Sequence, residues 1–293
     1  MINFVSKTEI HKGWSGDRKF CAVDRDGNKY LLRISPIEKA DRKKAEYAMA
    51  KEVASLGIPM CMPVDFWVCE DGVYSVYSWI EGNDARDALP FCTDAELYAY
   101  GVEAGRIQRI LHSILAPKDL PEWEDRYNKK LDTKLEKYKS CPLKYEKGEL
   151  LVKFVDSNRH LLANRPLTYQ HGDYHVGNMM IGKDGKLYII DFFDRNDFGD
   201  PWEDIKPITW DVAVSPVFAK GRIDGYFDGN IPENFWHLLA LYVTAGILSS
   251  LPWAIPFGEG EVEIMRKLAA DVLDWYDGMN SVVPKWYVNN REH

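Results

Sequence analysis

Alternating runs of hydrophobic and polar residues divide the chain into a strand-rich first part and a helix-rich remainder. An Asp-Gly pair between two apolar runs is a strong β-hairpin signal, because it suits the tight turn that joins paired strands. Three such pairs occur, at Asp26-Gly27, Asp71-Gly72 and Asp184-Gly185. The strands expected around them are residues 20–23 with 30–34, 66–69 with 73–77, and 179–181 with 187–190.

One helix is expected between the first two hairpins, at residues 39–56. Ala45, Met49 and Val53 recur there at the spacing of one helix face. The first eighty or so residues therefore predict an antiparallel sheet with one helix.

The pattern becomes helical after Gly82. Thr93 followed by Glu96 is a capping-box signal that opens a helix running toward His112. Residues 123–139 are heavily charged and predict a solvated surface helix, whose narrow apolar stripe is Leu131, Leu135 and Tyr138.

A further helix is expected at residues 149–164. Pro166 breaks the chain, and helices are expected to resume after Pro232. We therefore predict an α+β fold with a small antiparallel-sheet lobe, residues 1–81, and a larger, mainly helical lobe, residues 82–293.

Composition and charge exclude some function classes. The chain has 293 residues, of which 46% are hydrophobic and 28% charged, an ordinary globular balance. Its formal net charge of −8 argues against a nucleic-acid partner, because phosphate binding needs clustered Lys and Arg. The same charge suits a cationic small molecule, through electrostatic steering. No obligate protein partner is evident.

The cysteines and the apolar segments predict a cytoplasmic protein without a membrane partner. Five scattered cysteines never occur as Cys-x-x-Cys, which is typical of reduced thiols. The N-terminal residues lack the apolar core of a signal peptide. Residues 235–257 contain no Asp, Glu, Lys or Arg, and we interpret them as a buried helix ending near Pro252.

The most informative motif is His171-Gly172-Asp173-Tyr174-His175 with Asn178 and then Asp191. It places a carboxylate, an amide five residues later and a second carboxylate around a short hairpin. Asp173 is suited to orient or accept the proton of an attacking hydroxyl, while Asn178 and Asp191 hold magnesium against nucleotide phosphates. His171 and His175 are expected to hold the loop by hydrogen bonds to the backbone and to Asp173.

Other interpretations of this motif stay open. Alternate residues of a strand share a face, so His171, Asp173 and His175 also fit a metal-dependent hydrolase, although no third clustered His follows. A catalytically silent nucleotide-binding module keeps the fold but lacks activity. A protein kinase is disfavoured, because Phe192-Phe193 stand where Phe-Gly is expected.

These residues resemble the aminoglycoside phosphotransferase and choline kinase family, which has a protein-kinase-like, two-lobed fold. The resemblance covers nearly the whole chain in motif order. It implies Asp173 as catalytic base, Asn178 and Asp191 as Mg²⁺ ligands, and ATP as co-substrate. Asp204, in Asp200-Pro201-Trp202-Glu203-Asp204, resembles the family residue that supports the catalytic loop.

The resemblance also locates a nucleotide-binding loop in the first lobe. Gly13, Ser15 and Gly16 stand where the family has its nucleotide loop, before the first two expected strands, and glycines there let backbone amides approach phosphates.

Arg33 stands where kinases usually have a phosphate-binding Lys, and its planar fork suits phosphate oxygens. Glu46 is the candidate partner that orients Arg33, with Glu52 as the rival. Tyr77, Ser78, Trp79 and Ile80 would form the segment that binds the purine, and bulky Tyr77 leaves GTP as well as ATP open.

We therefore predict a magnesium-dependent kinase that transfers the γ-phosphate of ATP or GTP to a hydroxyl of a small, cationic acceptor. Asp194 and Asp197, in the acidic run after Asp191, are the candidate acceptor contacts. An aminoglycoside leads among acceptors, with macrolides, choline-like compounds, amino alcohols and sugars behind it. Antibiotic resistance is implied by the family name only.

Overall fold

The structure is a computed structural model, and the part of the chain that it describes comprises residues 2–11, 16–192 and 197–288. Contacts between Cα atoms group the chain into two compact units. Unit 1 comprises Met1–Ala88 and Val176–Asn196, and unit 2 comprises Leu89–His175 and Asp197–His293. The predicted division of function between residues 1–81 and 82–293 stays a prediction.

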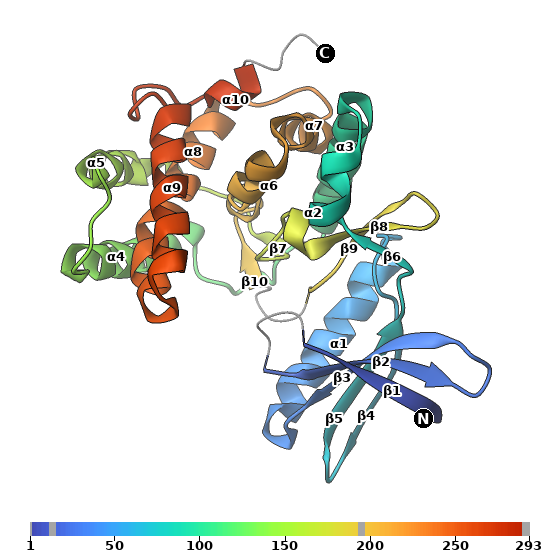
Figure 1. Cartoon of the computed structure of the whole chain (residues 1–293). Coiled ribbons are helices and arrows are strands. Elements are labelled where there is room, and N and C mark those ends of the chain that lie inside the picture. The colour runs from blue at the N-terminus through green and yellow to red at the C-terminus, as the bar shows by residue number, and fades with distance from the viewer. Residues whose placement is uncertain (1, 12–15, 193–196, 289–293) are drawn as a thin grey trace. The chain divides into compact units, whose positions relative to one another are not determined.

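Unit 1 is built on a five-stranded antiparallel sheet with the strand order β1-β2-β3-β5-β4 (Figure 1). Its strands are β1 (Phe4–Ile10), β2 (Arg18–Asp24), β3 (Lys29–Ser35), β4 (Pro63–Cys69) and β5 (Gly72–Ser78). The first two predicted hairpins are confirmed as β2 with β3 and β4 with β5. Strand β1 was not predicted, because all its side chains are exposed or half-buried and leave no apolar alternation.

Helix α1 (Ala40–Ser55) packs against strands β4 and β5 of the sheet, so the predicted helix at residues 39–56 is confirmed. The ring of Tyr47 on α1 stacks on Phe66, with centroids 5.1 Å apart, and lies 5.8 Å from the ring of Tyr77. Burial of these rings against the sheet stabilises the helix, whose outer face is charged.

A second, three-stranded sheet in unit 1 contains the third predicted hairpin. Its strands β6 (Gly82–Asp84), β8 (Met179–Gly182) and β9 (Leu187–Ile189) pair in the order β6-β8-β9. A Cβ atom at Gly82 would lie 2.3 Å from the carbonyl oxygen of Ile181, so only glycine fits this crossing. The short helices α2 (Ala85–Ala88) and η4 (Val176–Asn178) flank the sheet.

Unit 2 is mainly helical, as predicted, with one small two-stranded sheet. The sheet pairs β7 (Thr168–Gln170) with β10 (Asp197–Gly199). The helices are α3 (Asp94–Leu111), α4 (Trp123–Ser140), α5 (Gly148–Asn158), α6 (Ile208–Val214), α7 (Pro216–Phe227), α8 (Glu233–Ala254), α9 (Glu259–Trp275) and α10 (Lys285–Val288), with short 3-10 helices η2 (Leu89–Phe91), η3 (Arg159–Leu162), η5 (Glu203–Ile205) and η6 (Ile255–Phe257).

Helix α8 forms the centre of the core of unit 2. It packs against α4, α5 and α9, and most of its side chains are buried. The segment Glu233–Phe257 is long and apolar enough to cross a membrane, and 67% of its most apolar window is buried inside the protein, as in the core helix of a globular unit. The helix ends at Ala254, two residues after Pro252, so the predicted end near that proline is confirmed.

One helix prediction in unit 2 was wrong. Helices α6 and α7 form before Pro232, although helices were expected only after it. Ser215 caps α7 by accepting a hydrogen bond from Phe218 N, and Pro216 occupies its first turn. The glycines of α7 have low helix propensity, which hides the helix in the sequence pattern.

Helices α4 and α5 also differ in detail from the prediction. Buried Trp123 and Tyr127 widen the apolar stripe of α4, and the stripe packs on α8. Helix α5 ends at Asn158, where η3 continues the segment. The predicted capping box of α3 is confirmed, with Thr93 and Glu96 bonded reciprocally.

Glycines allow α3 and α7 to pack backbone against backbone. A Cβ at Gly105 would lie 2.1 Å from the Arg222 carbonyl oxygen, and one at Gly225 would lie 2.1 Å from that of Val102. Gly101 and Gly221 make the same close approach from each helix. Any side chain at these positions would force the helices apart.

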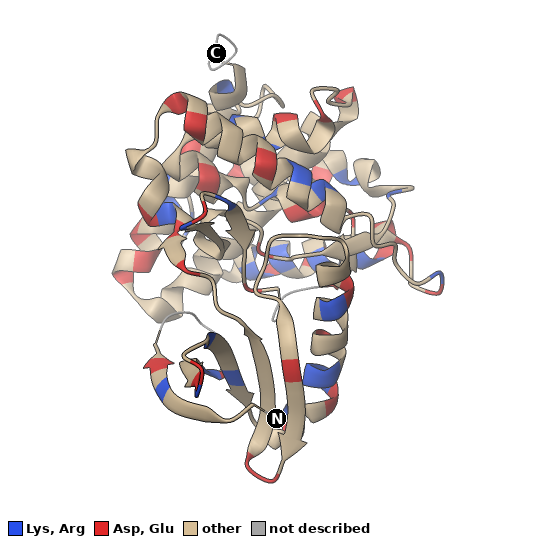
Figure 2. Cartoon of the chain, turned by 90° about the vertical axis from the view of Figure 1, so that its right-hand side faces the viewer, with Lys and Arg blue, Asp and Glu red and all other residues tan. Residues whose placement is uncertain are grey.

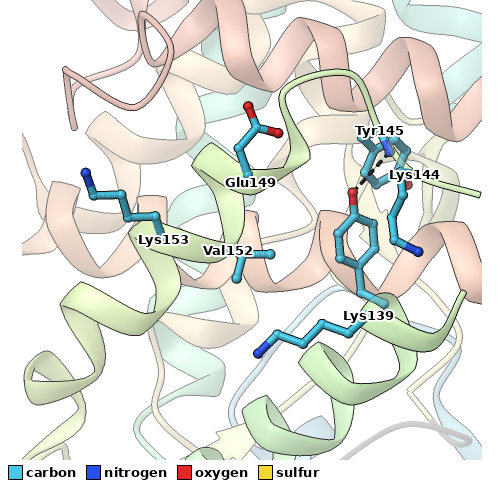
Figure 3. Close-up of a pocket in the computed structure, with 7 residues that line it drawn as sticks. Lys139, Lys144, Tyr145, Glu149, Val152 and Lys153 are labelled. Carbon is cyan, nitrogen blue, oxygen red and sulfur yellow. Dashed lines mark hydrogen bonds between the residues drawn. The ribbon is translucent and has the colours of Figure 1, made fainter.

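Charged residues of both signs occur along the helices of both units (Figure 2). The net charge of −8 therefore does not describe the local charge of a given site. A pocket of about 480 Å³ lies beside the end of α4 and the start of α5 (Figure 3). Its lining residues are Tyr138, Lys139, Lys144, Tyr145, Glu149, Val152 and Lys153.

Candidate active site

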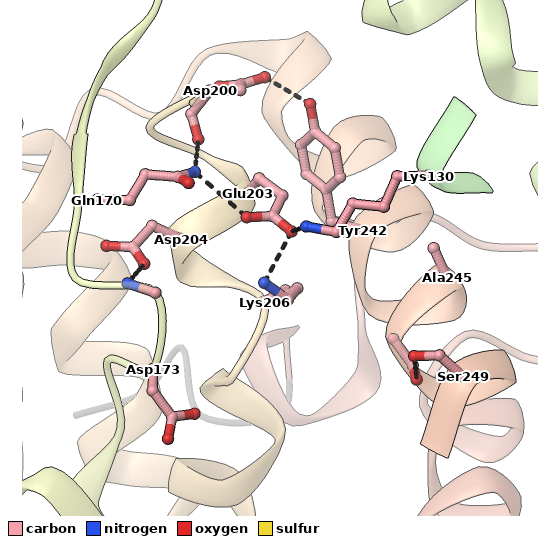
Figure 4. Close-up of polar contacts among 12 residues, drawn as sticks. Lys130, Gln170, Asp173, Asp200, Glu203, Asp204, Lys206, Tyr242, Ala245 and Ser249 are labelled. Carbon is pink, nitrogen blue, oxygen red and sulfur yellow. Dashed lines mark hydrogen bonds and ion pairs between the residues drawn. The ribbon is translucent and has the colours of Figure 1, made fainter. Parts of the chain in front are cut away.

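The backbone of the His171-Gly172-Asp173 loop is held by one buried carboxylate. Asp204 is fully buried and accepts hydrogen bonds from His171 N at 3.0 Å and from Gly172 N at 2.7 Å. Figure 4 shows Asp204 beside the loop that contains Asp173. Gly172 has φ = 82°, a conformation that glycine adopts without strain. The loop that follows β7 therefore has a fixed shape.

Asp204 is kept ionised by its own partners. Burial alone would raise the pKa of this carboxyl group, but the hydrogen bond and charge of His112 and the Gly172 N–H hold it well below its usual value. His112 Nε2 lies 3.1 Å from Asp204 Oδ2, and His112 Nδ1 lies 2.8 Å from the hydroxyl of Tyr226. A buried, charged acceptor holds the two backbone N–H groups more strongly than a neutral one.

Asp173 differs from its neighbours because its carboxylate is 27% exposed. Its backbone N–H donates to His171 Nδ1 at 3.2 Å. His175 Nε2 lies 3.6 Å from Asp173 Oδ1, which is longer than a direct hydrogen bond. The next residue, Tyr174, is buried and donates its hydroxyl to Ala104 O at 2.6 Å.

A second layer of polar groups lies beneath this loop, between α3 and α7. Gln108 donates to Asp204 O at 3.0 Å, and its Oε1 accepts from Arg222 Nη2 at 2.9 Å. Arg222 is completely buried, forms an ion pair with buried Asp211 and lies over the ring of Tyr174. We call Gln108, His112, Asp204, Asp211 and Arg222 the loop clamp.

Asp200 in the same segment anchors a different neighbour. Arg165 donates to it with Nε at 2.6 Å and Nη2 at 3.0 Å, and the hydroxyl of Tyr242 donates at 2.6 Å (Figure 4). This paired geometry fixes the chain just before Asp204.

Unit 1 contains a second buried group of charges, around Arg33 on β3. Arg33 Nη2 donates to Asp17 Oδ2 at 2.9 Å, and Lys43 Nζ on α1 lies 2.9 Å from the same oxygen. Lys43 Nζ also lies 2.8 Å from Glu46, which pairs with Arg42 as well. We call Asp17, Arg33, Lys43 and Glu46 the sheet cluster.

Asp17 is the common partner in the sheet cluster. Burial alone would raise its pKa, but hydrogen bonds from Lys43 and Ser35 and the charge of Arg33 lower it to about 2. Ser35 donates to Asp17 Oδ1 at 2.8 Å. The predicted pairing of Arg33 with Glu46 or Glu52 stays a prediction, and sequence reasoning missed Asp17 and Lys43.

The two predicted metal ligands both belong to unit 1, and one of them lies beside Arg33. Asp191 Oδ1 is 3.6 Å from Arg33 Nη1, and the Asp191 side chain is 37% exposed. Its backbone has φ = 67°, which is uncommon outside glycine and is best tolerated by Asp and Asn. Asn178, at the end of η4, accepts a hydrogen bond from Ile190 N at 3.0 Å through its carbonyl oxygen.

The predicted base-binding segment continues from β5. Tyr77 is buried and packs on Tyr47, whereas Ser78 and Trp79 are half-buried and Ile80 is buried. Ser78 bonds twice to Met62, through its backbone N–H and through its hydroxyl oxygen, each at 2.8 Å. These contacts fix the segment between β5 and β6.

Only some of the remaining predicted site residues belong to the described part of the chain. Gly13, Ser15 and Asp194 lie outside the described residues, whereas Gly16 is exposed. Asp197, expected to meet a cationic acceptor, forms an exposed ion pair with Arg126 on α4 at 2.9 Å.

Within residues 2–11, 16–192 and 197–288, no group of three or more His, Cys, Asp or Glu side chains is arranged to hold a metal ion. A hydrolytic metal site of the kind that His171 and His175 suggested needs three protein ligands. A magnesium site completed by nucleotide phosphates does not, since one amide and one carboxylate oxygen can suffice.

The fold and the site are those of a protein-kinase-like phosphotransferase. One unit is an antiparallel sheet with Arg33 on its third strand, and the other is helical with a clamped His-Gly-Asp loop. A family model described as the phosphotransferase enzyme family matches residues 7–236. The chain therefore belongs to that family and is a phosphotransferase with an alcohol group as acceptor. The predicted family and fold class are confirmed.

Solved structures share this fold at low sequence identity. A choline/ethanolamine kinase family protein from Mesorhizobium loti is 15% identical with a TM-score of 0.66, covering 95% of this chain and 92% of its own. An amicoumacin kinase in complex with AMP-PNP, Ca²⁺ and Ami is 15% identical with a TM-score of 0.63, covering 97% and 92%.

A macrolide 2'-phosphotransferase from Brachybacterium faecium is also similar. It is 15% identical with a TM-score of 0.60, covering 91% of this chain and 93% of its own. No curated protein matches the chain by sequence.

Proposed function

We propose that the protein transfers the γ-phosphate of ATP to a hydroxyl group of a small molecule, with Mg²⁺ as cofactor. The observation that carries the proposal is the clamped loop. Asp204 fixes the backbone of His171 and Gly172, while the next carboxylate, Asp173, is partly exposed. A carboxylate held in this way is suited to orient the acceptor hydroxyl and to take its proton during transfer.

The sheet cluster supports the nucleotide side of the proposal. Arg33 is buried and already held by Asp17, so its guanidinium is oriented before a phosphate arrives. We assign phosphate binding to Arg33 and to the Gly13–Gly16 loop, including Ser15. Glu46 would support Arg33 through the charges of α1.

The purine-binding role is assigned to Tyr77, Ser78, Trp79 and Ile80. Tyr77 already fills the space against Tyr47, which limits how deeply a base can enter. ATP is our first choice, and GTP is the direct comparison.

Asn178 and Asp191 have the oxygen donors that Mg²⁺ prefers. When bound there, magnesium would neutralise negative charge that develops on the phosphate during transfer. The distance of 3.6 Å between Asp191 and Arg33 supports this assignment, since one side chain would hold the ion and the other the phosphate. His171 and His175 would keep Asp173 oriented.

The acceptor is assigned as a small molecule with a free hydroxyl. Asp194 and Asp197 stay our proposed contacts for a cationic part of it. All five cysteines are free thiols, which supports the predicted cytoplasmic location. Antibiotics and metabolites are both tested as acceptors, which separates a resistance role from a metabolic one.

The test is a coupled assay of nucleotide consumption with ATP and with GTP. The acceptors are aminoglycosides, macrolides, choline, homoserine and thioribose sugars, each with Mg²⁺ and with EDTA. We expect acceptor-stimulated, magnesium-dependent turnover with at least one compound. Absence of stimulated turnover in every condition, with nucleotide still bound, would favour a binding module instead.

A further inference from the structure

Three lysines converge on one buried carboxylate in unit 2. Lys206, which follows η5, lies with Nζ 2.7 Å from Glu203 Oε1, and Lys130 on α4 lies with Nζ 3.5 Å from the same oxygen (Figure 4). Lys134, one turn further along α4, lies with Nζ 3.4 Å from Ala245 O on α8. We call Lys130, Lys134 and Lys206 the lysine cluster.

The lysine cluster carries more positive charge than its surroundings compensate. Glu203 is its only carboxylate partner among the described residues, and Lys134 has no ion pair there. The two nearby acids, Asp200 and Asp204, already have partners of their own. One negative charge therefore faces three amines.

This arrangement is unfavourable for helix α4 by itself. Lys130 and Lys134 are four residues apart, where like charges destabilise a helix by about 0.2–0.5 kcal/mol. Both amines lie over the buried ring of Tyr127, 5.4 and 5.9 Å from its centroid, which holds them on one side of the helix. Asp197 does not compensate the positive charge of the lysine cluster, because it forms an ion pair with Arg126.

Lys134 responds to this environment. Burial first, and then the charges of Lys206 and Lys130, lower its pKa to about 7, although Glu203 acts in the opposite direction. A nearby anion would stabilise the charged form of this amine. The other groups facing it are the Tyr127 ring from α4 and the Ala245 carbonyl from α8, neither of which is ionised near neutral pH.

The clamped loop is tied to the same carboxylate, because Gln170 donates to Glu203 Oε2 at 3.2 Å, three residues before Asp173. The lysine cluster and the clamped loop are thus linked through the same buried carboxylate, Glu203.

We propose that the lysine cluster is the subsite for an anionic group of the acceptor, a carboxylate or a phosphate, beside the hydroxyl that receives the γ-phosphate. This inference rests on the proposed function. It adds an anionic group to the cationic one expected from the net charge. The basic pocket of Figure 3 is a built-in comparison, because its Lys139 is exposed and has no ion pair or hydrogen bond among the described residues.

Matched acceptors test the charge directly. Glycerol, glycerate and glycerol 3-phosphate offer the same kind of hydroxyl with no anion, a carboxylate or a phosphate. Homoserine and 3-aminopropanol form a second pair that differs by a carboxylate. We expect kcat/KM to be at least tenfold higher for an anionic member than for its neutral or cationic partner, and the better anion identifies the source.

Variants then locate the effect. Lys134→Gln and Lys206→Gln should raise KM for the anionic acceptor at least tenfold and leave KM for nucleotide unchanged. Lys139→Gln, on the same helix, should change neither. Turnover that ignores the anionic group and is unaffected by Lys134→Gln would overturn the subsite while leaving the kinase proposal intact.

A binding measurement separates the two proposals. NMR signals of ¹³Cε-labelled lysines, assigned with the Gln variants, are followed while inorganic phosphate or acetate is added to the intact protein. We expect the Lys134 and Lys206 signals to move at millimolar phosphate, the pKa of Lys134 to rise, and Lys139 to stay unchanged. If phosphate binds there but no acceptor is phosphorylated, the subsite stands and the proposed function fails. If neither anion moves the Lys134 signal, the subsite is wrong.

Discussion

The loop clamp and the sheet cluster are both buried groups of charge, but they differ in what they leave accessible. In the loop clamp, Asp204, Asp211 and Arg222 have no exposed surface and contact other residues of unit 2. In the sheet cluster, Arg33 also reaches Asp191, whose side chain is 37% exposed. A fully buried group of charges can only hold the loop in its shape. A group with one exposed member can also bind a ligand.

This difference predicts different consequences for variants. Removing one partner from a sealed ion pair leaves an uncompensated charge with no water to solvate it, which costs about 3–5 kcal/mol. Removing one member of an open, branched group leaves the others paired. Stability should therefore depend more on the loop clamp, and nucleotide affinity more on the sheet cluster.

The largest effect is expected for Asp204→Asn. The amide keeps the shape but loses the charge that holds His171 N, Gly172 N and the His112 ring. We expect a loss of about 3 kcal/mol or more in the free energy of unfolding and loss of phosphoryl transfer. Urea unfolding and the transfer assay measure the two effects. Wild-type stability in this variant would mean that the loop is held by something other than Asp204.

Gly105→Ala should have the next largest effect on stability. The new Cβ would lie 2.1 Å from Arg222 O and 2.5 Å from Tyr226 N, both backbone atoms that cannot rotate away. We expect α3 and α7 to separate at a cost of about 3 kcal/mol. Gly246→Ala is the matched control, because that helical glycine has open space and should gain about 0.5–1 kcal/mol. Equal melting temperatures for the two variants would contradict backbone packing of these helices.

Arg33→Met should weaken nucleotide binding more than it lowers stability. Asp17 keeps Lys43 and Ser35 as partners, so we expect only about 1–2 kcal/mol of lost stability. The Kd for nucleotide should rise at least tenfold, because a charge-assisted phosphate contact is lost. Calorimetric titration of nucleotide checks this, with Arg42→Met, a more exposed arginine near the same cluster, as the control.

The smallest expected effect is the loss of stability at acidic pH. Asp17 and Glu203 have folded pKa values lowered from 3.8 and 4.5 to about 2, so each stabilises the fold fully at neutral pH. That contribution is lost as pH falls from the unfolded values toward 2, because the unfolded chain then binds protons first. Between pH 7 and pH 4 we expect the two together to account for about 1 kcal/mol. Glu203→Gln should flatten this part of the stability profile, and an unchanged profile would argue against the lowered pKa.

Short-range signals made much of the fold predictable from sequence. Three Asp-Gly hairpins, the helix near residues 39–56 and the Thr93 capping box each depend on neighbouring residues and were confirmed. Helix α7 escaped, because its glycines lower helix propensity and are explained only by contact with α3. Long-range packing decided that element, and no local pattern carries such information.

The candidate site divides in the same way. Asp173, Asn178 and Asp191 belong to a motif with chemical meaning, so the sequence could name them. Asp17 and Lys43 could not be found, because their role depends on two strands and a helix meeting. The lysine cluster draws on α4 and the segment after η5, more than seventy residues apart in sequence.

The most direct test of the proposed mechanism is single-turnover phosphoryl transfer by Asp173→Asn, measured beside nucleotide affinity. The substitution keeps size and the Asp173 N–H bond to His171, and removes only the group proposed to take the proton. We predict a nucleotide Kd within threefold of wild type and a transfer rate lower by about 10²–10⁴. Transfer at the wild-type rate would contradict the assignment of Asp173 as the catalytic base.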